Sequence, residues 1–185
     1  MPSRDIHSSD GGKKVRDFLS SMFSTLLLKQ DHEKPIYLIS PWISDFLVFD
    51  NKFSQFQGLF RNQPQVAEEL EIKFSDILLE LAANHPIRVI TSDETNSKTF
   101  LDKIDGSNNI EIRKQSPQMD HQKAFLSELF YFEGSMNFTY YGVYRNKEKI
   151  TCNHAKDSEG RRKITEAYFE YDRSWENLGE TQNTH

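Results

Sequence analysis

Two short and almost wholly apolar runs are the feature that most limits how this chain can fold. Residues 35–40 and residues 87–92 each read as a strand covered on both faces, because a strand with one face in water alternates apolar and polar residues. Elsewhere apolar residues recur at helical spacing, which predicts helices over residues 13–27, 66–84, 94–104 and 160–178. Strands that alternate with helices predict an α/β domain with a mixed, largely parallel central sheet flanked by helices on both faces.

One domain accounts for most of the chain, because 185 residues suffice for one substantial core and are too few for two. Residues 1–12 are rich in Ser, Asp and Gly and are predicted to form a mobile leader. Residues 13–178 form the domain, and residues 179–185 form a tail. Residues 45–64 carry five phenylalanines without a regular period, which predicts an aromatic loop insertion whose rings pack against the domain or against another subunit.

Composition narrows the classes of protein to which the chain can belong. No run of eighteen apolar residues occurs and no apolar stretch opens the chain, so the sequence predicts a cytoplasmic protein without a transmembrane segment. The only cysteine, Cys152, cannot form an internal disulfide and lacks partners at zinc-ligand spacing, so a small buried residue is expected there. The formal charge of −5 argues against a protein that coats nucleic acid, whereas a local basic patch is compatible with it.

The richest chemistry lies on two predicted strands, residues 122–127 and residues 130–133, which follow a predicted strand at residues 110–113. Side chains alternate between the two faces of a strand, so His121 and Lys123 point the same way. An imidazole and an ammonium group therefore share one wall of a pocket.

A glycine turn follows these strands. Gly134 permits a close backbone approach, which brings Ser135 and Asn137 beside the histidine and the lysine. Thr139 follows two residues later, before a last predicted strand at residues 148–152. An imidazole, an ammonium group, a hydroxyl and a carboxamide gathered in one place suit the binding of a phosphate group.

This arrangement resembles the HKD motif of the phospholipase D superfamily, particularly its small bacterial nucleases with one motif per chain. The resemblance rests on His121-x-Lys123, on the acidic residue five positions after the lysine, and on the Gly-Ser-x-Asn-x-Thr turn. It covers residues 120–151, because Glu148 stands where such nucleases carry the glutamate of an Asn-x-Glu sequence. Two departures concern Glu128, which replaces the usual aspartate, and the path from there to the glycine, which is one residue short.

The resemblance implies a phospholipase D-like fold and the metal-independent cleavage of a phosphodiester through a phosphohistidine, with no cofactor. The residues to which it assigns catalytic roles are His121, Lys123, Asn137, Ser135 and Glu148. In this scheme the histidine attacks, the lysine and the asparagine stabilise charge on the non-bridging oxygens, and the serine and the glutamate orient the imidazole. Supporting roles are implied for Glu128 and Thr139, and for Trp42, for which packing in the core is an equally good interpretation.

The chain holds only one copy of the motif, and this bears on its assembly. One imidazole cannot serve as nucleophile and as acid on opposite sides of an in-line displacement at phosphorus. In the nucleases that the chain resembles, two subunits meet about a twofold axis and share one site. The resemblance therefore implies a homodimer with the motif at its interface.

Basic residues on both sides of the motif favour nucleic acid as the substrate, and the resemblance favours DNA over RNA. These residues are Arg113, Lys114, Arg145 and Lys147. The habits of the family imply a DNA nuclease of a bacterial anti-phage defence or DNA-processing assembly, in which a larger partner such as an ATP-driven subunit supplies most of the grip on DNA. Two alternatives stay open: a lipid phosphodiesterase with an apolar rim from Trp42, Phe46 and Phe49, and a non-catalytic dimeric interaction subunit.

Overall fold

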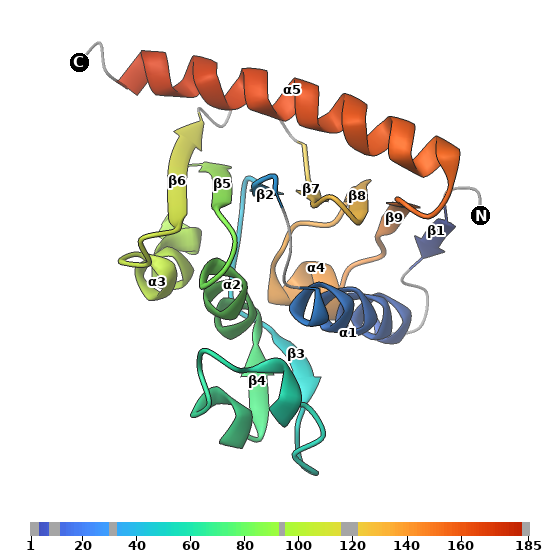
Figure 1. Cartoon of the computed structure of the whole chain (residues 1–185), viewed down its shortest axis with the longest axis vertical. Helices are drawn as coiled ribbons and strands as arrows, with labels where there is room; N and C mark the ends of the chain where they lie inside the picture. The colour runs from blue at the N-terminus through green and yellow to red at the C-terminus, as the bar shows by residue number, and fades with distance from the viewer. Residues whose placement is uncertain (1–3, 8–11, 30–32, 93–94, 116–121, 183–185) are drawn as a thin grey trace.

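The computed structural model of the chain describes residues 4–7, 12–29, 33–92, 95–115 and 122–182, the side chains of residues 180–182 excepted. The main sheet in this part of the chain has seven strands in the order β1-β9-β8-β7-β2-β5-β6 (Figure 1). These strands are β1 (Arg4–His7), β2 (Ile36–Ile39), β5 (Ile87–Ser92), β6 (Ile110–Gln115), β7 (Ala124–Leu126), β8 (Phe130–Gly134) and β9 (Lys149–His154). A second sheet pairs β3 (Leu47–Asp50) with β4 (Glu71–Lys73). The helices are α1 (Lys13–Leu28), α2 (Phe74–Ala82), α3 (Thr95–Ile104), α4 (Tyr140–Tyr144), α5 (Ser158–Gln182) and the short 3-10 helices η1 (Gln57–Leu59) and η2 (Val66–Glu68).

The main sheet is mixed, and its parallel part is confined to three strands. β2 pairs in parallel with β5, and β5 with β6, whereas the other four pairings among the described strands of the main sheet are antiparallel. The expected α/β class, mixed sheet and helices on both faces are confirmed, but the expectation of a largely parallel sheet is wrong. The reason is local: residues 127–129 join β7 to β8 by a turn, whereas a parallel crossover needs about a dozen residues or more.

Side chains of the central strands alternate between two buried layers. In β2, Tyr37 and Ile39 pack beneath α5, whereas Ile36 and Leu38 belong to the core on the opposite face, which α1, α2 and α3 cover (Figure 1). Every residue of β2 is buried, which is why this strand reads as one continuous apolar run. The strands predicted from the two apolar runs are thereby confirmed as β2 and β5.

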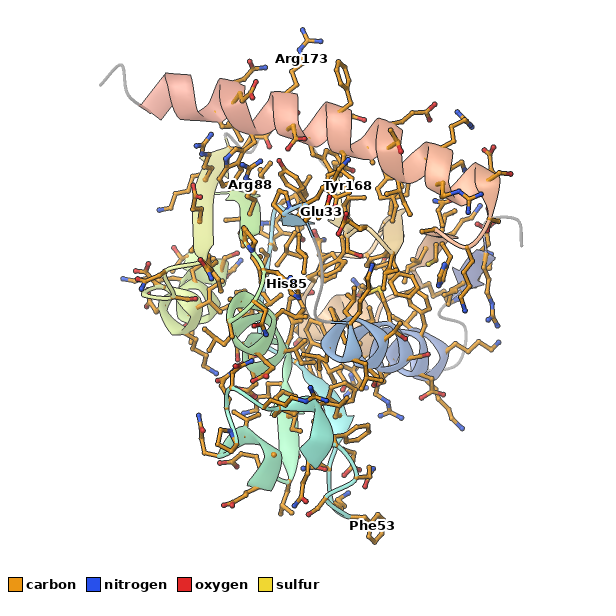
Figure 2. The ribbon with its side chains drawn as sticks, in the orientation of Figure 1. Glu33, Phe53, His85, Arg88, Tyr168 and Arg173 are labelled. Carbon is orange, nitrogen blue, oxygen red and sulfur yellow. The ribbon has the colours of Figure 1, made fainter. Side chains whose placement is uncertain are left out.

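Helix α5 runs across one face of the sheet and is tied to it by a partly buried polar cluster (Figure 1). Asp172 Oδ1 accepts hydrogen bonds from the Tyr37 hydroxyl at 2.5 Å and from Arg88 Nη1 at 3.0 Å. Figure 2 shows Arg88 and Tyr168 in the layer between the strands and α5. Burial raises the pKa of Tyr37 far above its ordinary value, so the phenol stays protonated and donates to the carboxylate.

The N-terminal segment, predicted to be a mobile leader over residues 1–12, contributes a strand instead. β1 pairs with β9 at the edge of the sheet. Asp5 accepts a hydrogen bond from Thr151 at 2.8 Å and forms an ion pair with Lys149 at 3.2 Å. The sequence gives no sign of this strand, because an edge strand with one buried side chain, Ile6, has no apolar pattern to detect.

At the other end of the described chain, α5 continues to Gln182, so residues 179–182 of the predicted tail are helical. Cys152 lies buried on β9, as expected, and burial raises the pKa of its thiol to about 11. No helix in the part of the chain that the structure describes combines the length and the apolarity needed to cross a bilayer.

The sequence prediction fails most in the lobe that carries β3 and β4, beside the main sheet (Figure 1). Residues 66–84 are predicted as one helix, but the first half of this range holds η2 and β4, and only α2 is an α-helix. Leu70, which contributes to the apparent helical stripe, is 63% exposed, whereas Ile72 on β4 is buried. A short strand followed by a helix produced apolar spacings that one longer helix would also give.

The predicted aromatic loop insertion, residues 45–64, is built around β3 and packs against the core of its own domain. Phe46, Phe49 and Phe60 are buried, and the rings of Phe46 and Phe74 stack with centroids 4.9 Å apart. Phe53 is 89% exposed and points away from the rest of the molecule at the tip of the lobe (Figure 2). Most of these rings therefore stabilise the lobe itself and leave no broad apolar face for another subunit.

Candidate active site

Lys123 and the glycine turn that carries Ser135 meet where β7 begins and β8 ends. Ala124 pairs with Ile39 of β2 on one side and with Glu133 of β8 on the other. The N–H of Gly134 donates a hydrogen bond to the carbonyl oxygen of Lys123 at 3.2 Å, so the lysine stands directly beside the glycine turn. The side chain of Lys123 is half-buried, whereas His121 lies outside the described residues.

Ser135 and Glu148 form a short polar contact on this turn. Ser135 Oγ donates a hydrogen bond to Glu148 Oε2 at 2.5 Å and accepts one from the backbone N–H of Lys149 at 3.1 Å. Glu148 is only 8% exposed, so the hydroxyl supplies a partner to a carboxylate that little water reaches. Gly134 is required for this approach, because a Cβ there would lie 2.1 Å from the carbonyl oxygen of Lys149.

Asn137 is held against the end of β2 by a buried serine. Ser40 Oγ lies 3.4 Å from Asn137 Oδ1. The same hydroxyl donates to the carbonyl oxygen of Trp42 at 2.7 Å and accepts from the backbone N–H of Phe138 at 3.3 Å. Ser40 is fully buried and Asn137 half-buried, so the carboxamide stands beside a buried hydroxyl and stays partly accessible. The sequence does not predict this contact of Ser40, whose position directly after a buried strand is its only distinguishing feature there.

Thr139 fixes the turn that carries Asn137. Its Oγ1 accepts a hydrogen bond from the backbone N–H of Gly142 at 3.1 Å and so caps the N-terminus of α4. The chain here runs beside the end of β2, since Ile43 and Phe138 form a parallel bridge. Thr139 is therefore bound to the backbone turn that carries Asn137.

A chain of hydrogen bonds connects the residue next to His121 with helix α5. Gln122 Nε2 donates to the Tyr171 hydroxyl at 3.0 Å, and the hydroxyls of Tyr171 and Tyr131 lie 3.1 Å apart. The Tyr131 hydroxyl also donates to Glu133 Oε2 at 2.7 Å. Burial raises the pKa of Tyr131 far above its ordinary value, so this phenol remains a donor. From the sequence, Tyr171 is only one residue of the predicted helix over residues 160–178, since a pattern of spacing does not reveal what a hydroxyl contacts.

The arrangement of strands and helices has counterparts among solved structures. NucT from Helicobacter pylori superposes with a TM-score of 0.59 at 11% identity, over 94% of this chain and 95% of that one. A phospholipase D family member, Nuc from Salmonella typhimurium, superposes with a TM-score of 0.54 at 16% identity, over 95% of this chain and 94% of Nuc. The chain has the phospholipase D-like fold.

This phospholipase D-like fold also matches part of a larger protein. Polyphosphate kinase from Porphyromonas gingivalis superposes with a TM-score of 0.56 at 13% identity, over 91% of this chain and 25% of the kinase. No protein-family model matches the sequence, and no curated protein matches it. The likeness is therefore one of fold, and the chemistry has to be argued from the residues of this chain.

Within the phospholipase D-like fold, Glu128 lies at the opposite end of β7 from Lys123. Glu128 Oε2 accepts a hydrogen bond from the backbone N–H of Glu33 at 2.9 Å, just before β2 begins. The structure thus places this carboxylate in the turn ahead of β2 and not beside the glycine turn.

The four basic residues expected to contact the substrate occupy different surroundings. Arg113 packs beneath α5, with Cζ 4.0 Å from the centre of the Trp175 ring and a hydrogen bond from Nη1 to the Trp175 carbonyl. Lys114 is exposed on β6 at the edge of the sheet. Arg145 and Lys147 are exposed in the connection between α4 and β9, which leads directly into the strand beside the glycine turn. Arg145 and Lys147 are therefore the basic side chains best placed beside the candidate site.

The apolar rim that a lipid phosphodiesterase would need is absent at the residues suggested for it. Trp42 is 41% exposed, but Phe46 and Phe49 lie in the core of the lobe. The interpretation of these three side chains as a membrane-facing rim is therefore wrong.

Proposed function

We propose that the protein is a phosphodiesterase of the phospholipase D type that cleaves DNA at a site built from two copies of the motif. One observation carries this proposal: Lys123, Asn137 and the pair of Ser135 with its glutamate converge beside the start of β7 in a phospholipase D-like fold. A cation, a carboxamide and a hydroxyl held by buried partners are groups that stabilise charge developing on a phosphate.

The reaction proceeds in two displacements at phosphorus. In the first, His121 attacks the phosphorus atom, a P–N bond forms, and the bond to the leaving oxygen breaks. The partner subunit's His121 donates a proton to that oxygen, which leaves as an alcohol. In the second, this partner imidazole takes a proton from water as the water oxygen attacks phosphorus, and the P–N bond breaks. Both histidines thereby return to their starting protonation states.

The described residues support these steps by fixing charge and orientation. Lys123 contributes a positive charge to the non-bridging oxygens, and Asn137 contributes an amide on a backbone that Ser40 binds through the N–H of Phe138. Donors that are positioned before the substrate arrives cost no reorganisation during the reaction. Ser135 and Glu148, which hold one another at 2.5 Å, orient the imidazole of the attacking histidine.

The assembly follows from one motif per chain and from the charge of the protein. A homodimer brings two imidazoles to one phosphate, which one chain cannot do. A formal charge of −5 repels DNA as a whole, so local contacts from exposed residues such as Arg145 and Lys147 have to carry binding. We extend the proposal to a bacterial anti-phage or DNA-processing assembly in which an ATP-driven partner subunit supplies the remaining grip on DNA.

The test is cleavage of labelled single- and double-stranded DNA in excess EDTA, with light scattering on the same samples. We expect wild type to be a dimer that cleaves, and His121→Ala to lose at least about 10³-fold in rate. His7→Ala is the matched control, because His7 is exposed on the edge strand β1. Mass spectrometry of an alkaline-quenched reaction should find phosphate on His121.

Two outcomes would contradict the proposal. A fully active monomer would rule out the shared site, even if the histidine proved essential. A folded dimer that cleaves no DNA in the presence or absence of EDTA would rule out the nuclease itself.

A further inference from the structure

Three exposed aromatic side chains flank Asn137. Trp42 is 41% exposed, Tyr140 43% and Tyr141 68%. The other large apolar side chains that are exposed in the described chain are dispersed over separate elements, and they are Leu28, Phe53, Leu70 and Phe169. We call Trp42, Tyr140 and Tyr141 the aromatic rim. Its place beside the candidate site distinguishes these rings from scattered surface residues.

Ser44 holds the backbone that carries the aromatic rim directly after Asn137. Ser44 donates its N–H to the carbonyl oxygen of Phe138 at 2.9 Å, and its hydroxyl accepts the N–H of Tyr140 at 3.0 Å. Because this pairing is parallel, Trp42 stands level with Asn137 on the neighbouring segment. The rim is therefore built on ordered backbone and not on a free loop.

The tyrosine rings are supported by one further ring beneath them. Tyr140 stacks on Tyr144 with centroids 4.9 Å apart, and Tyr141 meets Tyr140 edge-on at 5.8 Å. The Tyr144 hydroxyl donates to the carbonyl oxygen of Leu47 at 2.7 Å, which anchors the stack to β3. Tyr141, the outermost ring, is fixed at its edge and open over most of its surface.

Positive charge adjoins the aromatic rim. The backbone N–H groups of Arg145 and Asn146 donate to the carbonyl oxygen of Tyr141 at 2.9 Å and 2.8 Å. The exposed side chains of Arg145 and Lys147 follow Tyr141 by four and six residues. Exposed rings next to exposed cations are the combination with which proteins bind single-stranded nucleic acid, since cations contact phosphates and rings stack on bases.

We propose that the aromatic rim stacks the unpaired bases of a single-stranded substrate whose phosphate lies against Lys123 and Asn137. The inference rests on the proposed function and adds the strandedness of the substrate. Bases in a duplex cover one another's faces, so their faces are not available to Tyr141. Bases in a single strand expose their faces, and stacking then positions the adjoining phosphodiester at the site.

The test is binding of short oligonucleotides in EDTA by protein carrying His121→Ala, so that no cleavage disturbs the measurement. Fluorescence anisotropy compares oligothymidylate, an abasic strand of equal length and charge, and a duplex. We expect Tyr141→Ala to weaken oligothymidylate binding by at least about fivefold and to leave abasic and duplex binding unchanged. Stacking should also quench tryptophan fluorescence, and Trp42→Ala should abolish that quenching.

The matched control is Phe53→Ala, because Phe53 is as exposed as any rim residue but lies at the tip of the lobe (Figure 2). It should bind all three ligands as the parent does. Equal affinity for oligothymidylate and the abasic strand, or a Tyr141→Ala protein that loses its dimer in light scattering, would overturn the rim as a base-stacking surface.

Binding and cleavage measurements test the aromatic rim and the nuclease activity separately. If protein with His121 intact cleaves DNA but binds oligothymidylate no better than the abasic strand, only the base-stacking role of the aromatic rim is ruled out. If binding depends on the bases but no cleavage occurs, base stacking on the aromatic rim is supported and the nuclease activity is ruled out.

Discussion

The two ends of β7 hold charged residues of one sequence motif in opposite situations. At the start of the strand, Lys123 stands beside the glycine turn that carries Ser135. At the other end, the carboxylate of Glu128 accepts the backbone N–H of Glu33, just ahead of β2. The first end presents polar groups from several elements together, whereas the second end ties one turn to the next strand.

Residues that are near one another in a sequence motif are therefore not always near one another in space. A strand rises roughly 3.3 Å per residue, so the three residues of β7, which lie between Lys123 and the turn that holds Glu128, span roughly 10 Å. The two charges cannot contact the same phosphate from one chain. One sequence motif can thus include residues placed to contact a ligand and residues that stabilise the fold. Their hydrogen-bond partners in the structure show which residues are of which kind.

The largest effect that separates the two ends should come from Lys123→Met. We expect DNA cleavage to fall by about 10² to 10³-fold, the loss that follows removal of one fixed group that stabilises transition-state charge. The melting temperature should change little, because the chain of methionine replaces most of the packing of the lysine stem. Rate measurements beside Lys52→Met, an exposed lysine of the lobe, provide the control. Retained cleavage would remove Lys123 from the site.

Ser135→Ala should affect both stability and activity, because Ser135 hydrogen-bonds a buried carboxylate. Loss of its hydroxyl leaves Glu148 short of a partner, which should cost about 1–3 kcal/mol of unfolding free energy in urea denaturation. Cleavage should fall by about tenfold to 100-fold through misplacement of the imidazole. Glu148→Gln tests the charge separately, since it keeps a carbonyl oxygen for Ser135. An alanine variant with wild-type stability would show that the contact contributes nothing.

Regular periodicity made most of the fold predictable. β2, β5 and α1 follow from apolar runs or stripes whose burial the structure bears out. The helix over residues 66–84 failed because β4 is three residues long, too short to establish a period of its own. The parallel share of the sheet was overestimated because pairing partners are set by connections such as the turn over residues 127–129, which strand patterns do not contain.

The candidate site was predictable only where its residues are neighbours in sequence. Ser135 and Asn137 lie two residues apart on one turn, and the resemblance supplied Glu148 as their companion. Ser40 meets Asn137 across a sequence separation of 97 residues, and no local pattern announces such a contact. The aromatic rim could not be predicted for the same reason, since the exposure of Tyr141 depends on how α4 is placed in the fold.

Glu128→Ala tests the end of β7 that lies away from the candidate site. It should lower stability by a small amount and leave cleavage almost unchanged. We expect unfolding free energy to fall by about 1 kcal/mol, because the N–H of Glu33 can turn to water once its carboxylate partner is gone. DNA cleavage should stay within about twofold of wild type, since uncoupled sites act independently. Glu128→Asp should restore part of the stability if the shorter side chain still reaches the N–H. A large loss of cleavage with unchanged stability would show that Glu128 belongs to the active site and is not a purely structural residue.

The smallest expected effect is on the pH dependence of stability, and it comes from His154 at the end of β9. His154 packs edge-on against Phe130 with ring centroids 4.6 Å apart, and its Nδ1 accepts the N–H of Lys156 at 2.9 Å. Burial lowers the pKa of His154 below its ordinary value, so the folded protein binds this proton less readily than the unfolded chain. The unfolded state therefore gains protons first as pH falls through the ordinary histidine range, and the stability that the neutral ring contributes is lost there. Urea denaturation at several pH values should give an unfolding free energy that depends less steeply on pH for His154→Gln than for wild type. Equal slopes for wild type and His154→Gln would mean that the pH sensitivity of the fold arises elsewhere, and a change in the pH profile of cleavage would mean that the two ends of the sheet are coupled.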